Sequence, residues 1–380
     1  GYGYLSLGEL FGGVPLVDRF YETLKLDFSR SSRAVTYRFA INDLKRAASN
    51  LPEYPSEAGR VARGAACHFL SEAYLALATI NDNNAAQLDT AIAYADTVMA
   101  MHPLMTSRFG TRTVSGNAKN GVDSYYKDGN VFFDLFQEGN YDHSEGNTEA
   151  VWTLENDYTV YHKYAGDNYV PSPKNFSPVL RDAVWGSAYR NTGGGAGPWA
   201  TKRNPADYPG GNVSAYLGGQ GTAVYSPTDY VIEQIWDNDE GDIRNAPCNI
   251  RRTFVCTDTK SSMYGKACGI DMLDAGSQRI TEFFPIWTKF APVDDWGYDD
   301  ISDGGDRSQI YCDRYAVRSA ETLLLRAEEK LRKGDKAGAA ADVNILRKRA
   351  QCKVLATASD MTLQYILDER ARELYGEERR

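Results

Sequence analysis

The sequence has few of the residues that build metal centres, redox centres and disulfide frameworks. Its 380 residues include only six cysteines and four histidines. The chain has neither a CxxC pair nor an HExxH run, so zinc ribbons, thioredoxin-type centres and zincin proteases are not indicated. The histidines, His68, His102, His143 and His162, are scattered, and none stands near a serine or cysteine nucleophile motif. His68 falls on a helical stripe and is expected to be a packed side chain.

Basic clusters and long apolar runs are also missing. The formal charge is -9, and no basic patch with interleaved aromatics is present, which argues against nucleic acid as a partner. No apolar run is long enough to span a membrane. The chain begins at Gly1 without an initiator methionine, a signal-peptide pattern or a lipid-acceptor cysteine, so these residues alone predict neither export nor anchoring.

The few cysteines are expected to be buried thiols. Cys67 lies in an alanine-rich helical pattern, where it behaves as a small hydrophobic residue. Cys248, Cys256 and Cys268 are clustered in sequence and could hold a disulfide in an exported protein, with a connectivity that sequence does not reveal. Free thiols are the preferred interpretation because cysteine is among the most buried residue types.

What the chain does have is a strong helical pattern at its C-terminal end. Apolar residues recur every three or four positions from Asp313 to Lys333, which predicts a helix over that range. Gly334 should end this helix and Asp335 should cap the next, which then folds back antiparallel. The expected buried stripes are Val317, Ala320, Leu324, Ala327 and Leu331 in the first helix and Ala339, Val343, Leu346 and Ala350 in the second.

A third C-terminal helix follows, with Ser359 or Asp360 as its expected cap. Its expected apolar face consists of Leu363, Leu367, Ala371 and Leu374. Its expected exposed face consists of Glu369, Arg370, Arg372 and Glu373.

The same kind of pattern appears near the N-terminus. The stripes are Tyr37, Ile41, Leu44 and Ala48, then Ala62, Ala66, Phe69, Ala73, Leu77 and Ile80, then Ala85, Leu88, Ile92, Ala95 and Met99. Asn84 should cap the last of these helices, and His102 with Pro103 should end it. Helix pairs with alanine-rich contact faces are typical of tetratricopeptide-like (TPR-like) repeats. The predicted fold is mainly α: TPR-like helical repeats form a scaffold around a large loop-rich insertion that contains a few short strands.

The middle of the chain, from about Ser107 to Ser308, is rich in Gly, Pro, Asn, Asp and aromatic residues. Short strands are expected at Ala150–Leu154 and Thr253–Cys256, and one short helix at Asp229–Trp236. Because long ordered loops on a rigid scaffold are where binding residues concentrate, the ligand site is predicted in this insertion.

Several segments, in their order along the chain, resemble the SusD/RagB family of lipid-anchored outer-membrane nutrient-binding proteins of Bacteroidetes. They are LFGGVPLVDRF near the start, the helical segments over 30–52 and 59–78, NTEAVWTLEND, the central segment over 227–255, FFPIWTKF, and the C-terminal RYAVRSAETLLLRAEEKLRKGD and ILDERARELYGEERR. Glu369, Arg370, Glu373 and Glu377 match the family's C-terminal signature and are interpreted as structural ion pairs between packed helices.

The resemblance implies a cell-surface glycan-binding protein. Such a protein captures oligosaccharides or polysaccharides and delivers them to a SusC-like TonB-dependent outer-membrane transporter, without making or breaking bonds. It implies an outer-membrane, surface-exposed location through an N-terminal lipid anchor that this chain does not contain. It also implies one domain over 1–380, truncated at both ends relative to the family, with helical pairs at 1–106, the ligand-binding insertion at 107–308 and C-terminal helices at 309–380.

Sugar recognition requires flat aromatic faces against the C–H face of a pyranose and planar polar groups that bind its hydroxyls. The segment over 182–212 meets both needs best, and the segment over 292–300 is a second candidate. The predicted ligand-binding residues are Trp185, Tyr189, Arg190, Asn191, Trp199, Arg203, Asn204, Tyr208, Trp296 and Tyr298. The alternative is that Trp185 and Trp199 only pin a long loop to the scaffold. Trp152 and Trp236 fall on apolar patterns and are expected in the core.

Other chemistries fit the sequence less well. The run TGGGAGPW lacks the GK[ST] of a phosphate-binding loop, and no cofactor is expected. The run DNDEGD, Asp237–Asp242, is a partial match to a calcium loop, which leaves a structural calcium ion open. A glycoside hydrolase is the main alternative, with the acidic pairs Asp294–Asp295 and Asp299–Asp300 as candidates, and a soluble TPR-type peptide-binding scaffold is the other.

Overall fold

The computed structural model describes residues 1–110, 129–137, 139–156, 175–178, 223–237, 239–255, 266–273, 283–290 and 313–377. Its α-helices are α1 (Tyr2–Phe11), α2 (Arg33–Asn50), α3 (Arg63–Thr79), α4 (Ala85–Met101), α6 (Val131–Asp134), α10 (Asp229–Ile232), α11 (Ser319–Lys333), α12 (Lys336–Arg349) and α13 (Leu363–Leu374). Its 3-10 turns are η3 (His143–Glu145), η5 (Gln234–Trp236), η6 (Ile243–Asn245) and η7 (Ile270–Met272).

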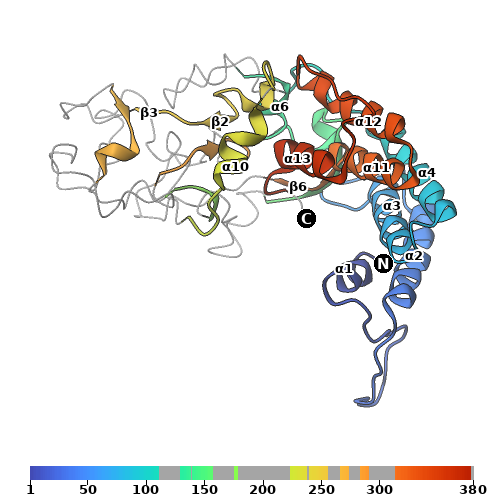
Figure 1. Cartoon of the computed structure of the whole chain (residues 1–380). Coiled ribbons are helices and arrows are strands. Elements are labelled where there is room, and N and C mark those ends of the chain that lie inside the picture. The colour runs from blue at the N-terminus through green and yellow to red at the C-terminus, as the bar shows by residue number, and fades with distance from the viewer. Residues whose placement is uncertain are drawn as a thin grey trace, which may run out of the picture.

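The strands form antiparallel pairs. They are β1 (Ala150–Leu154) with β6 (Arg314–Arg318), β2 (Ile250–Arg251) with β5 (Ile286–Trp287), and β3 (Phe254–Val255) with β4 (Ala267–Cys268). Figure 1 shows α2, α3, α4, α11 and α12 gathered at one end of the molecule, while α10, β2 and β3 lie toward the other.

The N-terminal helices follow the predicted stripes. Tyr37, Ile41 and Leu44 of α2 are buried, and α2 and α4 both pack on α3. The predicted stripe of α3 is buried up to Leu77, whereas Ile80 lies past the helix end and is exposed. The alanines in these stripes let the helix backbones approach closely, as in TPR-like repeats.

The start and end of α4 are also as predicted. The Asn84 side chain accepts a hydrogen bond from the backbone N–H of Gln87 at 3.2 Å, and the helix ends at Met101 before His102. Leu88 and Ala95 of the predicted stripe are fully buried. The Asn84 side chain therefore provides a hydrogen-bond partner for one of the backbone N–H groups that the first turn of a helix leaves unpaired.

The C-terminal hairpin of α11 and α12 is confirmed. Gly334 adopts a left-handed conformation with φ 92°, which glycine reaches without strain, and the helix ends there. The Asp335 side chain then accepts a hydrogen bond from the backbone N–H of Gly338 at 2.8 Å and begins α12. The predicted core residues Ala339, Val343 and the others of that stripe are buried.

The two ends of the chain form one helical scaffold. Helix α11 packs on α4 and also contacts α3, so the C-terminal hairpin continues the N-terminal helices. Leu75, Leu88 and Leu325 belong to one buried cluster at this contact. The imidazole of His68 on α3 lies 2.8 Å from the hydroxyl of Thr322 on α11, which confirms His68 as a packed core side chain.

The predicted helix from Asp313 was wrong at its start. Residues 314–318 form β6, which pairs with β1 from Arg314 opposite Leu154 to Arg318 opposite Ala150. Tyr315 and Val317 are residue types that favour strands, and β1 offers the backbone partners. Val317 is buried, but it belongs to β6, so its three-residue spacing from Ala320 does not reflect a helix.

The faces of α13 were predicted only in part: Leu374 is buried as expected and Ala371 is partly buried against the core, but the other assignments were wrong. Leu363 is 41% and Leu367 39% exposed, whereas Glu369, Arg370 and Glu373 are buried. The helix therefore turns its charged side toward the molecule's interior. Buried charges are tolerated when they are paired, and the partners come from segments far away in the sequence.

The cap of α13 was predicted at Ser359 or Asp360, and this was wrong. The Thr362 hydroxyl accepts the hydrogen bond from the backbone N–H of Tyr365 at 3.1 Å, so the capping residue lies two positions after Asp360. The Asp360 carboxylate instead accepts from the backbone N–H of Thr357 in the preceding turn. Both residues are capping types, and tertiary packing decides between them.

The short elements of the insertion agree with the sequence patterns. Strand β1 has the predicted bounds, and β3 lies within the strand predicted at Thr253–Cys256. The helix predicted at Asp229–Trp236 is divided into α10 and the 3-10 turn η5. Trp236 is buried in a cluster with Trp287 and Phe284, as predicted for a core residue.

Trp152 is only partly buried, and it packs against the helical core from β1. Its ring N–H donates to the carbonyl of Gly59 at 3.1 Å, so the polar N–H group of the ring has a hydrogen-bond partner. Cys67 and Cys352 are free buried thiols, as expected. Cys256 and Cys312 lie outside the described residues.

Helix α1 was not predicted. It contains Gly3 and Gly8, which weaken a helical pattern. Leu5 and Gly8 are nevertheless buried, and α1 packs on α2. A Cβ at Gly8 would come within 2.7 Å of the Tyr37 ring, so the glycine allows this close approach.

Among the described helices, none has both the length and the apolar content needed to cross a bilayer.

The buried ring of His102 makes a prediction about pH and stability. Burial, together with the nearby His143, lowers the His102 pKa from 6.5 to about 4. As pH falls below 6.5 the unfolded chain binds this proton before the folded one does, so the free energy of unfolding should fall by roughly 3 kcal/mol between pH 6.5 and pH 4. Urea unfolding across this range should show a smaller loss for His102→Gln than for the unsubstituted chain. Equal losses would contradict the assignment.

Candidate functional site

The ten predicted ligand-binding side chains all lie outside the described residues. They are Trp185, Tyr189, Arg190, Asn191, Trp199, Arg203, Asn204, Tyr208, Trp296 and Tyr298. Among the interacting side chains in the described parts of the insertion and the scaffold, we consider three groups. These are a buried ion-pair network, a carboxylate cluster and an aromatic ladder.

The buried ion-pair network joins the insertion to α12, β6 and α13. It consists of Glu149, Asp239, Asp242, Arg244, Lys289, Arg318, Arg347, Arg349, Glu369, Arg372, Glu373 and Glu377. The four signature carboxylates and guanidiniums expected to form structural ion pairs are Glu369, Arg370, Glu373 and Glu377, and all of them do so.

Glu373 is the centre of this network. One carboxylate oxygen accepts hydrogen bonds from Arg318, at 2.6 Å, and from Arg349, and the other accepts from Arg244 at 3.1 Å. Burial opposes ionisation of Glu373, but the three guanidiniums outweigh it and hold the pKa of Glu373 well below its ordinary value. The carboxylate is therefore charged in the folded protein.

Lys289 extends the network into the insertion. Its buried ammonium group lies 2.7 Å from a carboxylate oxygen of Glu377 and donates to the backbone carbonyl of Glu373 at 3.2 Å. Burial and the nearby Arg318 lower the Lys289 pKa, while Glu377 opposes that shift. The insertion thus supplies a cation whose counter-charge, Glu377, lies in the turn that follows α13.

The partial calcium motif contributes to the same network. Asp242 pairs with Arg244 at 2.6 Å, and Asp239 lies 2.7 Å from Arg372 and also accepts from Arg347. These two carboxylates of DNDEGD therefore face guanidinium groups. Arginine supplies here the positive charge that a metal ion would supply in a calcium loop.

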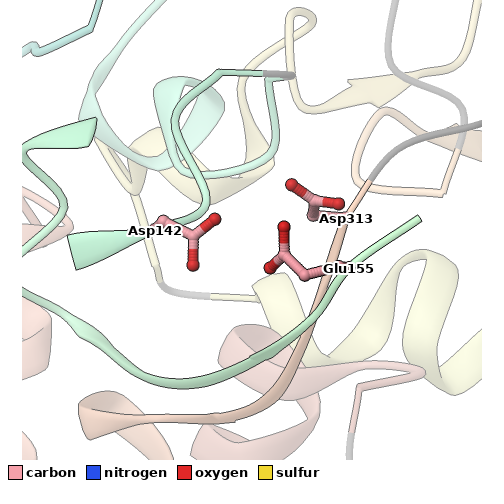
Figure 2. A group of neighbouring side chains, drawn as sticks. All are labelled: Asp142, Glu155 and Asp313. Carbon is pink, nitrogen blue, oxygen red and sulfur yellow. The ribbon is translucent and has the colours of Figure 1, made fainter. Parts of the chain in front are cut away.

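The carboxylate cluster lies where the chain leaves β1 and where it returns to β6. Asp142, Glu155 and Asp313 each offer a carboxylate oxygen within 4.8 Å of the others. Figure 2 shows the three carboxylates pointing toward one another. The backbone N–H of Asn156 donates to Asp313 at 2.7 Å, and the Thr153 hydroxyl donates to Asp142 at 2.6 Å, so both aspartates are held in place.

Three close carboxylates cannot all ionise easily. Burial, followed by the charges of Asp313 and Asp142, raises the Glu155 pKa from 4.5 to about 7. A proton on Glu155 therefore stabilises the folded state, and this contribution is lost as pH rises through about 7. Chemically the cluster can hold a proton near neutral pH, and its oxygen ligands are of the kind that bind hard cations.

The aromatic ladder runs from the core of the insertion to its surface. The ring of Phe290 is buried and stacks on Phe176, with centroids 4.4 Å apart and planes at 19°. Phe176 stacks in turn on Tyr225, with centroids 5.0 Å apart and planes at 30°. Tyr225 is 55% exposed. An exposed ring is thus supported from behind by two others.

Neither the carboxylate cluster nor the aromatic ladder was predicted from sequence. Glu155 and Asp313 come together only because β1 pairs with β6, and the residues of β6 were predicted to be helical. Tyr225 belongs to no recognised sequence motif. Tyr225 and Tyr230 nevertheless lie in one exposed polar run, which has the mixture of aromatic and polar residues that sugar recognition requires. Knowledge of the β1–β6 pairing would have identified the first group.

The fold and these side-chain groups define a TPR-like helical scaffold with a loop-rich insertion locked onto its C-terminal helices. A family model described as the SusD family matches residues 181–380, which is more than half of the chain. The protein therefore belongs to the SusD family, as the sequence segments indicated. No curated protein sequence matches the chain.

Solved structures agree with this fold. A SusD superfamily protein from Parabacteroides distasonis is 17% identical, with a TM-score of 0.59 over 98% of this chain and 63% of that one. A laminarin-binding SusD-like protein is 19% identical, with a TM-score of 0.52 over 98% of this chain and 66% of that one. A structure with a xylogluco-oligosaccharide is 19% identical, with a TM-score of 0.53 over 97% of this chain and 60% of that one. This chain therefore spans less than two thirds of the length of each.

The network predicts a large stability loss on removing its central charge. Glu373→Gln keeps the side-chain size but leaves three buried guanidiniums without their shared carboxylate, which should cost about 3–5 kcal/mol of unfolding free energy. Urea unfolding followed by circular dichroism measures this. Glu240→Gln, which removes the exposed partner of Lys353, is the matched control and should change little. A Glu373→Gln variant as stable as the control would refute the central role.

The carboxylate cluster predicts an unusual titration. The carboxyl group of Glu155 should lose its proton near pH 7, as followed by NMR of side-chain carboxyl carbons. Asp313→Asn removes one neighbouring charge and should lower that pKa. Asp89→Asn removes an exposed carboxylate paired with Lys333 and should leave it unchanged. Identical Glu155 titrations in both variants would show that Asp313 does not contribute.

Proposed function

We propose that this protein is a cell-surface glycan-binding protein that captures oligosaccharides and delivers them to a SusC-like TonB-dependent outer-membrane transporter. The observation that carries the proposal is membership of the SusD family over residues 181–380. The laminarin-binding relative and the structure with a xylogluco-oligosaccharide support glycan as the ligand class. The ligand site belongs to the insertion, and the helical scaffold faces the transporter.

The binding residues in this proposal are those of the aromatic segments. Trp185 and Trp199 offer flat faces to pyranose rings, and Arg190, Asn191 and the other polar residues of that segment bind hydroxyls, with Trp296 and Tyr298 as a second contribution. Family membership supports a location at the outer membrane, and the proposal adds surface exposure through a lipid anchor. Neither a cofactor nor a metal ion has a role in capture, and a calcium ion at DNDEGD would be structural.

Capture without catalysis distinguishes this proposal from a glycoside hydrolase. A hydrolase needs two carboxyl groups placed on either side of a glycosidic bond. The acidic pairs Asp294–Asp295 and Asp299–Asp300 lie outside the described residues. In the described part, Asp142 is buried and already accepts the hydroxyl hydrogen bond of Thr153. We therefore expect bound glycan to be released unchanged.

Isothermal titration against a panel of polysaccharides tests the proposal. The panel contains xyloglucan, laminarin, starch and polygalacturonate, and the same samples are analysed for shortened products. Trp199→Ala should bind about tenfold more weakly, as expected for losing about 1.4 kcal/mol with one stacked aromatic ring. Phe20→Ala removes an aromatic ring that is 88% exposed outside the insertion and is the matched control.

The outcomes separate the alternatives. Binding without shortened products, weakened only by Trp199→Ala, supports capture at the insertion. Shortened products would support the hydrolase. No binding across the panel would refute the glycan proposal, and peptide binding in that case would favour a TPR-type scaffold.

A further inference from the structure

We infer that Tyr225 is a stacking platform for a neutral pyranose ring, in addition to the aromatic residues over 185–208 and 296–298. This inference rests on the proposed function, because it names one contact surface of a glycan-binding protein. It is independent of those residues, since it is carried by the described segments at 175–178, 223–237 and 283–290 and by α13.

The first step is the fixed position of the ring. Phe290 is buried, Phe176 is partly buried and Tyr225 is exposed, so the stacked rings form a continuous column from core to surface. The backbone adds to this support. The N–H of Tyr225 donates to the carbonyl of Asn175 at 2.9 Å, and the N–H of Ala223 donates to the carbonyl of Ser177 at 3.1 Å.

The second step is the consequence for binding. An exposed aromatic side chain ordinarily loses rotamer freedom when a ligand packs on it, which reduces the affinity. Tyr225 is already ordered by Phe176, so little of that freedom remains to be lost. Its exposed surface offers an apolar ring face and a hydroxyl at the ring edge, the combination that matches the C–H face and the hydroxyls of a sugar.

The third step is the polar environment. The segment from Val224 to Tyr230 is exposed except for Pro227, and it adds Ser226, Thr228 and Asp229 to the two tyrosines. The exposed residues that flank Tyr225 in the chain therefore carry hydroxyl and carboxylate groups. Aromatic faces beside a few fixed polar groups are the usual composition of a small-molecule site.

The fourth step concerns ligand charge. The Tyr230 hydroxyl donates to Asp368 on α13 at 2.7 Å, and Asp229 precedes Tyr230 in the exposed run. Arg372 is a cation that interacts electrostatically with Tyr230. Its positive charge is already paired with Asp239 and Glu369. A uronic acid or sulfated sugar would approach two carboxylates here, whereas a neutral hexose meets hydrogen-bond acceptors.

The alternative explanation is that Tyr225 only covers Phe176. Leucine at 225 would still cover Phe176 with an apolar side chain but would not present a flat face. Phenylalanine would keep the face and remove only the hydroxyl. Comparing Tyr225→Leu with Tyr225→Phe therefore separates stacking from packing. Val224→Ala, at the exposed neighbouring position, is the matched control.

The experiment is isothermal titration of the full chain and these variants with xyloglucan, laminarin, starch and polygalacturonate. We expect Tyr225→Leu to bind the neutral glycan at least about fivefold more weakly, Tyr225→Phe within about twofold, and Val224→Ala unchanged. Thermal unfolding of Tyr225→Leu should match the unsubstituted chain. Phe176→Leu, which keeps Tyr225 but removes its support, should also weaken binding.

Three results would overturn the inference while leaving the proposed function intact. They are Tyr225→Leu binding as tightly as the unsubstituted chain, equal losses in Tyr225→Leu and Tyr225→Phe, and tighter binding of polygalacturonate than of any neutral glycan. If the unsubstituted chain binds no polysaccharide in the panel, the proposed function fails, and the inference fails with it.

Discussion

The pairing of one buried carboxylate, Glu373, with three guanidiniums is the interaction on which the arrangement of the molecule depends. Arg318 comes from β6, Arg349 from the end of α12 and Arg244 from the insertion, and all three converge on α13. Each charge is tolerable only because the others are present, since an unpaired ion in this environment would cost several kcal/mol. Hydrogen bonds between charged groups also require defined geometry, so the network determines the orientation of the insertion as well as its proximity to the scaffold.

The predictable part of the fold is the part in which apolar periodicity and burial coincide. The stripes of α2, α3 and α12 and the Gly334–Asp335 junction follow from local rules, and the structure has them. Helix α13 shows the limit of those rules, because its buried face contains Glu369 and Glu373, whose partners lie in distant segments. Strand β6 shows a second limit. Its residues could equally have formed the first turn of the following helix, and they form a strand because β1 pairs with them. In both cases a tertiary contact overrode a local preference.

The site was less predictable for the same reason. A composition rich in aromatic and polar residues predicts a ligand site in the insertion, but composition does not show which rings are supported by other rings and which are not. Tyr225 becomes notable only when Phe176 and Phe290 are seen stacked behind it. The carboxylate cluster likewise requires the approach of Glu155 to Asp313 across the β1–β6 pair. Chemistry that depends on two distant segments leaves no spacing pattern in the sequence.

The β1–β6 pair has a consequence for how such proteins can diversify. The chain leaves the scaffold at Leu154 and returns at Arg314, which is its direct partner in the pair. The segment between β1 and β6 is therefore a closed loop whose two ends are held side by side by the strand pair. The entropy of closing a loop grows only logarithmically with its length, so doubling the segment between β1 and β6 would cost only about 0.6 kcal/mol. Segments can be gained, lost or replaced between these two strands while the helices remain unchanged, which lets one scaffold present many different recognition surfaces.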